Sequence, residues 1–136
     1  MQVNTYLNFD GKCEAAFQFY AESLGGKIDA MVAHEGTPAG EHVPSEWRGK
    51  ILHASMTVNG TVLMGSDTPP DRYQKPQGFA VSLQTPTPEE AERAFQALSK
   101  NGTVGMPIQE TFFAARFGML VDQFDVPWMI NCAPAA

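Results

Sequence analysis

The segment Ile51–Ser66, with the sequence ILHASMTVNGTVLMGS, decides how the rest of the chain is interpreted. Two alternating runs flank Asn59-Gly60, and this dipeptide supplies the two positive-φ residues that a type I′ hairpin turn requires. The segment is therefore predicted to be a β-hairpin. The cross-strand neighbours that a two-residue turn predicts are Val58 with Thr61, Met56 with Leu63, and His53 with Ser66.

Side chains alternate between the two faces of a strand, so the predicted register divides the hairpin into two sets. One set is apolar enough to pack against helices: Leu52, Ala54, Met56, Val58, Leu63 and Gly65. The other set is mixed, as the wall of a cleft would be: His53, Ser55, Thr57, Val62, Met64 and Ser66. We expect the function of the protein to lie on the mixed face.

The composition narrows the class of protein. With 136 residues, 43% of them hydrophobic, the chain is predicted to fold as a single domain spanning residues 1–136. No apolar run approaches the roughly 20 residues that cross a bilayer, and no secretory signal is recognisable. A net charge of −6 without a Lys/Arg cluster argues against nucleic-acid binding. Cys13 and Cys132 lack CxxC spacing, which is typical of reduced thiols, and the protein is expected to be cytoplasmic.

Upstream of the hairpin, alternation predicts a strand over Val3–Phe9. Asp10 is expected to cap a helix that runs to about Leu24 and ends at Gly25-Gly26. A second strand is predicted over Lys27–Ala33. His34–Gly49 is rich in Pro, Gly and Glu, which indicates a surface loop or a lid, with Trp47 as its anchor.

The same order of elements then repeats. A strand is predicted over Gly78–Gln84, followed by a helix with Thr87 as its N-cap, Pro88 at its first position and Glu90 closing a capping box. Further strands are predicted near Val104, over Phe112–Val121 and over Val126–Cys132.

The repeat defines the predicted fold class, an α+β fold of two βαβββ modules, at about residues 1–67 and 77–134. Ala16-Phe17-Gln18 and Ala94-Phe95-Gln96 lie at equivalent places in the two helices, which supports the repeat. The two modules are expected to form a curved mixed sheet around a cleft, with the helices on the outer face.

Four segments carry a family resemblance: YLNFDGKCEAAFQFY, ILHASMTVNGTVLMGSD, PQGFAVSL and FFAARFGMLVDQFDVPWMINC. Together they resemble the PhnB-like branch of the vicinal-oxygen-chelate superfamily, which includes glyoxalase I, bleomycin-resistance proteins and extradiol dioxygenases. The resemblance implies paired βαβββ modules around a cleft, usually assembled as dimers. The turn that this branch usually writes Phe-Gly-Val reads Phe124-Asp125-Val126 here, and Asp tolerates the left-handed backbone that the turn needs.

Catalytic members of the superfamily hold a divalent metal with His and Glu at four inward strand positions. By the resemblance these positions fall on Asn4, Met64, Phe79 and Met129. Amide, thioether and phenyl groups do not replace imidazole and carboxylate as ligands of such an ion. We therefore expect neither a metal nor a cofactor.

Two further residues are singled out for ligand binding. His53 is the one histidine on the mixed face, and is either a hydrogen-bonded structural residue beside Ser66 or Asp67, or a ligand-binding group or general base. Arg116 is predicted to lie opposite Asn131 on the face of Met129, where it would bind an anion; the alternatives are a pair with Glu110 or a surface position. The predicted ligand-binding set is Asn4, Tyr6, His53, Ser55, Met64, Ser66, Phe79, Arg116 and Met129.

The sequence therefore predicts a small-molecule-binding protein with a metal-free cleft, assembled as a homodimer. One alternative is an enzyme, either a metal-dependent lyase or dioxygenase or a metal-free catalyst that uses His53 for acid/base chemistry. Another is a resistance protein that sequesters an antibiotic. Relatives in this branch have carried a methyltransferase label, but the chain has no strand-linked GxGxxG loop for the adenosyl cofactor.

Overall fold

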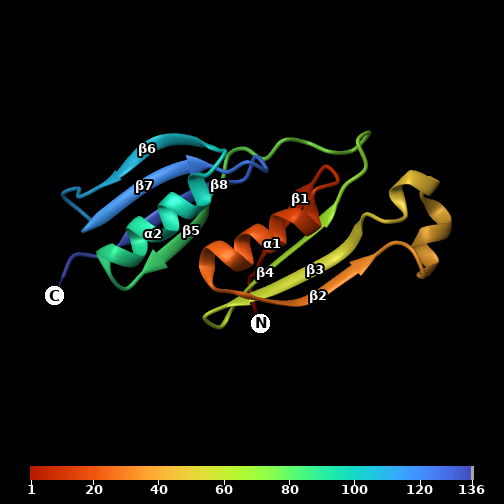
Figure 1. The fold of residues 1–136 in the computed structure, drawn as a ribbon, viewed down its shortest axis with the longest axis horizontal. Helices are drawn as coiled ribbons and strands as arrows, with labels where there is room; N and C mark the ends of the chain where they lie inside the picture. Colours follow the sequence, from red (N-terminus) through yellow and green to blue (C-terminus); the bar gives the residue numbers. More distant parts are fainter. Residues whose placement is uncertain (136) are drawn as a thin grey trace. The chain divides into compact units, whose positions relative to one another are not determined.

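The computed structural model describes residues 1–135 and divides the chain into two compact units, Met1–Gln74 and Lys75–Ala136 (Figure 1). Both units have the element order βαβββ, so the chain has the predicted α+β class and the predicted repeat. In the described residues, no helix is long and apolar enough to cross a membrane.

Unit 1 contains a four-stranded sheet with the strand order β1-β4-β3-β2. β1 pairs with β4 in parallel, and the other pairs are antiparallel. Its elements are β1 (Thr5–Phe9), α1 (Cys13–Leu24), β2 (Lys27–Ala33), the 3₁₀ helices η1 (Pro38–His42) and η2 (Ser45–Trp47), β3 (Ile51–Val58) and β4 (Thr61–Asp67).

Unit 2 repeats this topology in the order β5-β8-β7-β6, again with one parallel pair, β5 with β8. Its elements are β5 (Val81–Thr85), α2 (Pro88–Ser99), β6 (Thr103–Gln109), β7 (Arg116–Val121) and β8 (Pro127–Cys132).

The predicted hairpin is confirmed. Asn59 and Gly60 have φ values of 47° and 82°, the two positive angles of a type I′ turn. The pairing runs from Val58 with Thr61 to Ala54 with Gly65, in the predicted register. It ends one step before His53 and Ser66. A register shift near Ala33 breaks the alternation at the start of β3, where Ile51 is buried and Leu52 is partly exposed.

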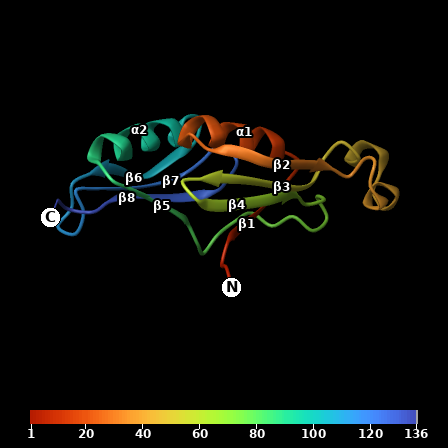
Figure 2. The same ribbon diagram turned by 90° about the horizontal axis from the view of Figure 1, so that it is seen from below.

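α1 packs on one face of the unit 1 sheet (Figure 2). The residues that it buries are Cys13, Ala16, Phe17 and Tyr20. The Phe17 ring rests on β4 at Gly65, where an added Cβ would lie 2.9 Å from both the ring and the Leu7 carbonyl oxygen. A glycine is therefore needed where the helix meets the centre of the sheet.

α2 packs on its own sheet in the same way, with Ala91, Ala94, Phe95 and Leu98 buried. The Phe95 ring lies 2.7 Å from the position of a Cβ at Gly118, in the central strand β7. Trp128 of β8 lies on the helix side of this sheet and is buried, as its alternation with Met129 predicts.

Several predicted boundaries are wrong. β1 begins at Thr5 rather than Val3, and β8 begins at Pro127 rather than Val126. α1 begins at Cys13 with Lys12 at the N-cap, and the exposed Asp10 does not cap it. β5 begins at Val81, so Phe79 precedes the strand. Residues 112–115 precede β7 in a loop, because the hydroxyl of Thr111 accepts hydrogen bonds from the backbone amides of Phe113 and Ala114.

Candidate functional site

The side of the unit 1 sheet opposite α1 carries a mixed set of side chains, which we call the open face. In β3 and β4 the residues on the α1 side, such as Ala54, Met56 and Leu63, are buried, whereas those between them are partly exposed. We restrict the name open face to the part of this side around the start of β3, which consists of Tyr6, Asn8, His53, Ser55, Met64 and Ser66. Thr57 and Val62 continue the same side of the sheet toward the hairpin turn. The hairpin register therefore brings six polar or thioether side chains from three strands onto one surface.

Two of these side chains form a pair across β4. The Tyr6 hydroxyl lies 3.2 Å from His53 Nδ1, and the two rings stack with centroids 5.8 Å apart and an interplanar angle of 27°. Tyr6 belongs to β1 and His53 to β3, the two strands that flank β4. The register places Met64 of β4 directly between Tyr6 of β1 and Ser55 of β3.

Asp67 is not the partner of His53, because its carboxylate faces the helix side and is fully engaged there. Oδ1 accepts hydrogen bonds from the amides of Gly11 and Cys13, at 3.0 and 2.9 Å, and Oδ2 accepts one from Ile51 at 2.8 Å. The side chain is buried. Asp67 therefore ties the start of α1 to the start of β3, a role the sequence did not reveal because its partners lie up to 56 positions away.

Asn4 lies just before β1, where it is exposed, and its Nδ2 donates a long hydrogen bond to Gln2 Oε1 at 3.5 Å. Asn4 is therefore not brought to the Tyr6–His53 pair by any described hydrogen bond. Of the predicted unit 1 residues, Tyr6, His53, Ser55, Met64 and Ser66 share the open face.

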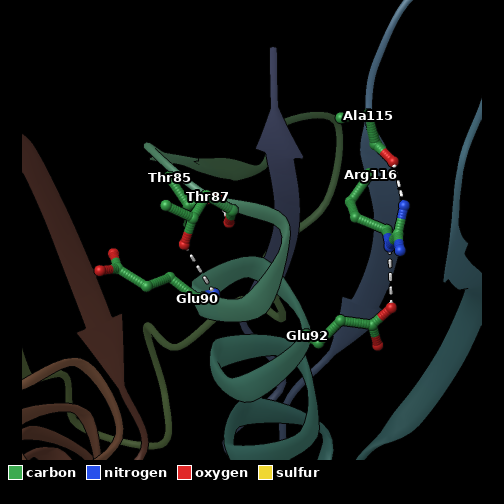
Figure 3. A network of polar contacts seen from close by, with 6 residues as sticks. All are labelled: Thr85, Thr87, Glu90, Glu92, Ala115 and Arg116. Carbon is green, nitrogen blue, oxygen red and sulfur yellow. Dashed lines mark hydrogen bonds and ion pairs between the residues drawn. The ribbon is translucent and has the colours of Figure 1, made fainter. Parts of the chain in front are cut away.

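The predicted register of Arg116 is wrong. Arg116 pairs with Cys132, not Asn131, and therefore lies on the face that carries α2. Its Nε donates to Glu92 Oε1 of α2 at 2.9 Å, and its Nη1 donates to the Ala115 carbonyl (Figure 3). This ion pair, rather than one with Glu110 or a ligand anion, engages the guanidinium.

The turn between β7 and β8 explains the shift by one residue. Asp122 Oδ1 accepts hydrogen bonds from the amides of Phe124 and Val126, and Oδ2 accepts one from Trp128 Nε1. Val126 is thereby held in the turn, and the first strand pair is Val121 with Pro127. Asp125 has a φ of 69°, so the expected left-handed turn forms without glycine.

Unit 2 carries a different surface opposite α2. Met129 pairs with Met119 and Ser82, and Phe79 is 46% exposed ahead of β5. Beside them, Asn131 Nδ2 donates to Gln84 Oε1, and Gln84 Nε2 donates to Ser82 Oγ, both at 2.8 Å. Sequence reasoning missed this polar row, although the alternation of Ser82 and Gln84 in β5 was a signal for it.

The donor chemistry in the described chain does not fit the metal that the superfamily implies. No group of three or more His, Cys, Asp or Glu side chains comes together in residues 1–135. The residues that the resemblance assigns to the family's ligand positions are Asn4 and Met64 in unit 1 and Phe79 and Met129 in unit 2. None of the four supplies an imidazole or a carboxylate.

The loop between β2 and β3 forms a hollow of its own, with a volume of about 510 Å³. His34, at the start of this loop, is buried with its Nδ1 2.9 Å from the Lys50 carbonyl oxygen, and the Thr37 hydroxyl donates a hydrogen bond to the His34 carbonyl. Its lining residues are Glu35, Gly36, Thr37, Pro38, Gly40, Glu41 and Arg48. Trp47 is buried beside Gly11, as an anchor of this loop would be. Whether the loop acts as a lid stays a prediction.

Cys13 does not present a reactive thiolate. Burial raises the pKa of its thiol far above the ordinary value, and the negative charges of Asp67 and Glu14 raise this pKa further. Cys13 is therefore a buried structural residue in the first turn of α1.

Comparison with known proteins places this geometry in a family. A family model described as 3-demethylubiquinone-9 3-methyltransferase matches residues 1–131. Protein YjdN from Escherichia coli (strain K12) is 34% identical over 142 residues, which cover 96% of this chain and 95% of that protein. The crystal structure of protein PA1353 from Pseudomonas aeruginosa shares 42% identity with a TM-score of 0.89, covering 98% of each chain.

A PhnB protein from Bacillus cereus shares 26% identity with a TM-score of 0.82, covering 98% of this chain and 100% of that one. A glyoxylase/bleomycin resistance protein/dioxygenase domain from Frankia sp. EAN1pec covers 98% of both chains at 12% identity and a TM-score of 0.66, a likeness of fold alone. The chain therefore belongs to the family described as 3-demethylubiquinone-9 3-methyltransferase, the PhnB-like branch of the vicinal-oxygen-chelate superfamily.

Proposed function

We propose that the chain binds a small organic molecule on the open face of unit 1, with the Tyr6–His53 pair at the centre of the site. The observation that carries the proposal is the 3.2 Å hydrogen bond between these two side chains, which fixes an aromatic ring and an imidazole on an otherwise exposed sheet surface. A small-molecule site typically combines apolar lining with a few placed polar groups. Met64 supplies the apolar part here, and Ser55 and Ser66 supply hydroxyls.

The fold supports the same proposal at a coarser level. The vicinal-oxygen-chelate fold is a small-molecule-binding fold, and a fosfomycin resistance protein from Listeria monocytogenes has it at 8% identity and a TM-score of 0.68. Fold alone does not carry function, so the ligand must be argued from the residues of the open face.

Titration of the protein with a metabolite library, followed by thermal shift and by NMR of the imidazole of His53, tests the proposal. We expect a ligand that raises the melting temperature to perturb the His53 signals, and His53→Ala to weaken its binding about tenfold or more. His42→Ala is the matched control, because His42 is an exposed histidine of the 34–49 loop. A ligand whose affinity is equal in both variants would show that binding occurs elsewhere.

The predicted contacts of Asn4, Phe79 and Met129 with a ligand stay proposals. Single alanine substitutions at these positions, in the same titration, test each contact separately.

The resemblance also implies a homodimer. Sedimentation equilibrium measures the mass in solution, and the mass of a monomer would contradict this expectation.

A second candidate is metal-free acid/base catalysis by His53, which the hydrogen bond to Tyr6 favours. A phenol and an imidazole in contact can exchange a proton, and imidazole is the usual general base near neutral pH. A bell-shaped rate profile for a library substrate that is lost in His53→Ala would establish it. Binding of a ligand without any conversion to product would contradict catalysis and support a role in binding alone.

The description of the family names a methyl transfer, which can be tested by measuring whether the protein binds the methyl donor. The chain contains no GxGxxG sequence, the loop that holds an adenosyl cofactor in many methyltransferases. Calorimetry with S-adenosylmethionine is therefore expected to give no heat of binding. Saturable binding would instead make methyl transfer the leading function.

Sequestration of an antibiotic would also require a ligand site on the open face. Including antibiotics in the ligand library therefore tests this alternative in the same titration.

A further inference from the structure

We infer that Tyr6 holds His53 in the Nε2–H tautomer, and that the site consequently takes a ligand with an uncharged carbonyl oxygen on an apolar body. This inference rests on the proposed function for its ligand, whereas its tautomer is a property of the protein alone. The carrying observation is that the pair uses Nδ1, 3.2 Å from the Tyr6 hydroxyl.

The direction of this hydrogen bond follows from the chemistry of the two groups. A phenol is the more acidic donor and a neutral imidazole nitrogen the more basic acceptor, so the Tyr6 O–H donates to Nδ1. The proton of a neutral imidazole is then on the other nitrogen, because the hydrogen bond at one ring nitrogen sets the state of the other. The stacked arrangement keeps both rings in place for this contact.

Nε2–H is then a donor without a described partner on the open face. In residues 1–135, His53 makes its side-chain hydrogen bond through Nδ1, and the Asp67 carboxylate is engaged by backbone amides on the opposite face. His53 is partly exposed, so the donor can meet a ligand. The neighbouring hydroxyls of Ser55 and Ser66 can also donate. The site is therefore matched to an acceptor oxygen.

The charge of the surroundings favours an uncharged acceptor over an anion. None of the six residues around His53 is a Lys or Arg, and the one basic residue of the described strands that the register places on the same side of this sheet is Lys27, at the far end of β3. Lys27 and Asp29 lie beside Thr57, whose hydroxyl donates to Asp29. Thr57 is four residues along β3 from His53, roughly 13 Å away. The protein as a whole carries a net charge of −6, which repels anions.

The side chains of Met64 and Val32, next to the Tyr6–His53 pair, indicate what kind of apolar group the ligand would carry. Met64 lies between Tyr6 and Ser55 in the register, and Val32, which pairs with His53, is exposed beside it. A thioether and a branched alkyl group suit an aromatic or alkyl body. The carbonyl is therefore expected to meet Nε2–H while the body lies over Met64.

The first arm of the test measures the tautomer in the ligand-free protein by the nitrogen-15 chemical shifts of the His53 ring, above the pH at which free imidazole titrates. We expect a protonated Nε2 and an unprotonated Nδ1 in the wild type, and a mixture of the two tautomers in Tyr6→Phe. Predominance of the Nδ1–H tautomer in the wild type, or identical shifts in both proteins, would overturn the inference whether or not any ligand is found.

The second arm uses three probes with the same aromatic body: acetophenone, benzylamine and benzoate. We expect acetophenone to perturb His53 and to bind at least fivefold more tightly than either charged probe, with the preference reduced in Tyr6→Phe. Tighter binding of benzylamine or benzoate, or no perturbation by any probe, would overturn the ligand class. The library titration still decides separately whether the open face binds a small molecule at all.

Discussion

The two helices of the protein start in different ways, although they occupy the same place in two units of the same topology. α2 is capped locally: Thr87 Oγ1 accepts a hydrogen bond from the amide of Glu90 at 3.2 Å, and Pro88 follows it (Figure 3). α1 has no side-chain cap from its own N-terminal residues, and the remote Asp67 of β4 binds the amides of Gly11 and Cys13 instead. A local cap stabilises a helix by itself, whereas a remote one couples the helix to the sheet.

The largest expected effect comes from removing the remote carboxylate. Asp67→Ala leaves three amides without their acceptor, two of them in buried hydrogen bonds, and should lower the free energy of unfolding by about 3 kcal/mol or more. Urea denaturation measures it. Asp10→Ala is the control, because Asp10 is exposed beside the same helix and should change stability by less than about 0.5 kcal/mol. Equal effects would refute the remote cap.

The second prediction concerns what the two helices share, a phenylalanine resting on a glycine. Gly65→Ala and Gly118→Ala should each cost about 1–3 kcal/mol, because the new Cβ would meet Phe17 at 2.9 Å and Phe95 at 2.7 Å. Denaturation of both variants tests this, and Gly49→Ala, with open space at its Cβ position, is the control. Smaller partners, in Phe17→Leu and Phe95→Leu, should reduce the additional cost of each alanine.

A third prediction concerns the Cys13 thiol at the start of α1, whose pKa is raised first by burial and then by the negative charges of Asp67 and Glu14. The raised pKa of the Cys13 thiol keeps it protonated in the folded chain, whereas in the unfolded chain it titrates at its ordinary pKa of 9.0. Above that pH the unfolded state binds fewer protons, so the stability lost with pH should be steeper in the wild type than in Cys13→Ala, by up to about 1.4 kcal/mol per pH unit. Denaturation curves from pH 7 to about pH 10 compare the two slopes. Parallel slopes would contradict the shift.

The smallest expected effect is at the local cap. Thr87→Ala should cost about 1 kcal/mol and Thr87→Ser much less, because serine keeps the accepting hydroxyl. Hydrogen exchange of the first turn of α2 provides the measurement. A loss as large as that of Asp67→Ala would remove the distinction between the two helix starts.

The sequence predicts those features whose causes lie within a few residues. Asn59-Gly60 specified the turn and the register of the hairpin, and Thr87-Pro88 specified the start of α2. The role of Asp67 was not predictable in the same way, because Gly11 and Cys13 become its partners only when β1 and β4 pair. Arg116 was placed on the wrong face because Asp122 holds Val126 inside the turn, and one residue of turn length exchanges the faces of a strand.

The candidate site also contains features with local causes and features that depend on distant residues. His53 and its open-face neighbours followed from alternation within one hairpin. The contact with Tyr6 joins residues 47 positions apart, and it could be found only after the parallel pairing of β1 with β4 was known.

The carboxylate of Asp67 has a consequence for how this family can change over time. It fastens Cys13 and Ile51 to the same point of the framework, so the chain re-enters the sheet at a fixed place after the loop between β2 and β3. The hydrogen bond from the His34 amide to the Lys50 carbonyl oxygen holds the place where it leaves. Closing a longer loop costs little additional entropy. Insertions and deletions can therefore accumulate in the 34–49 segment, and remodel its hollow, without altering the frame that presents His53.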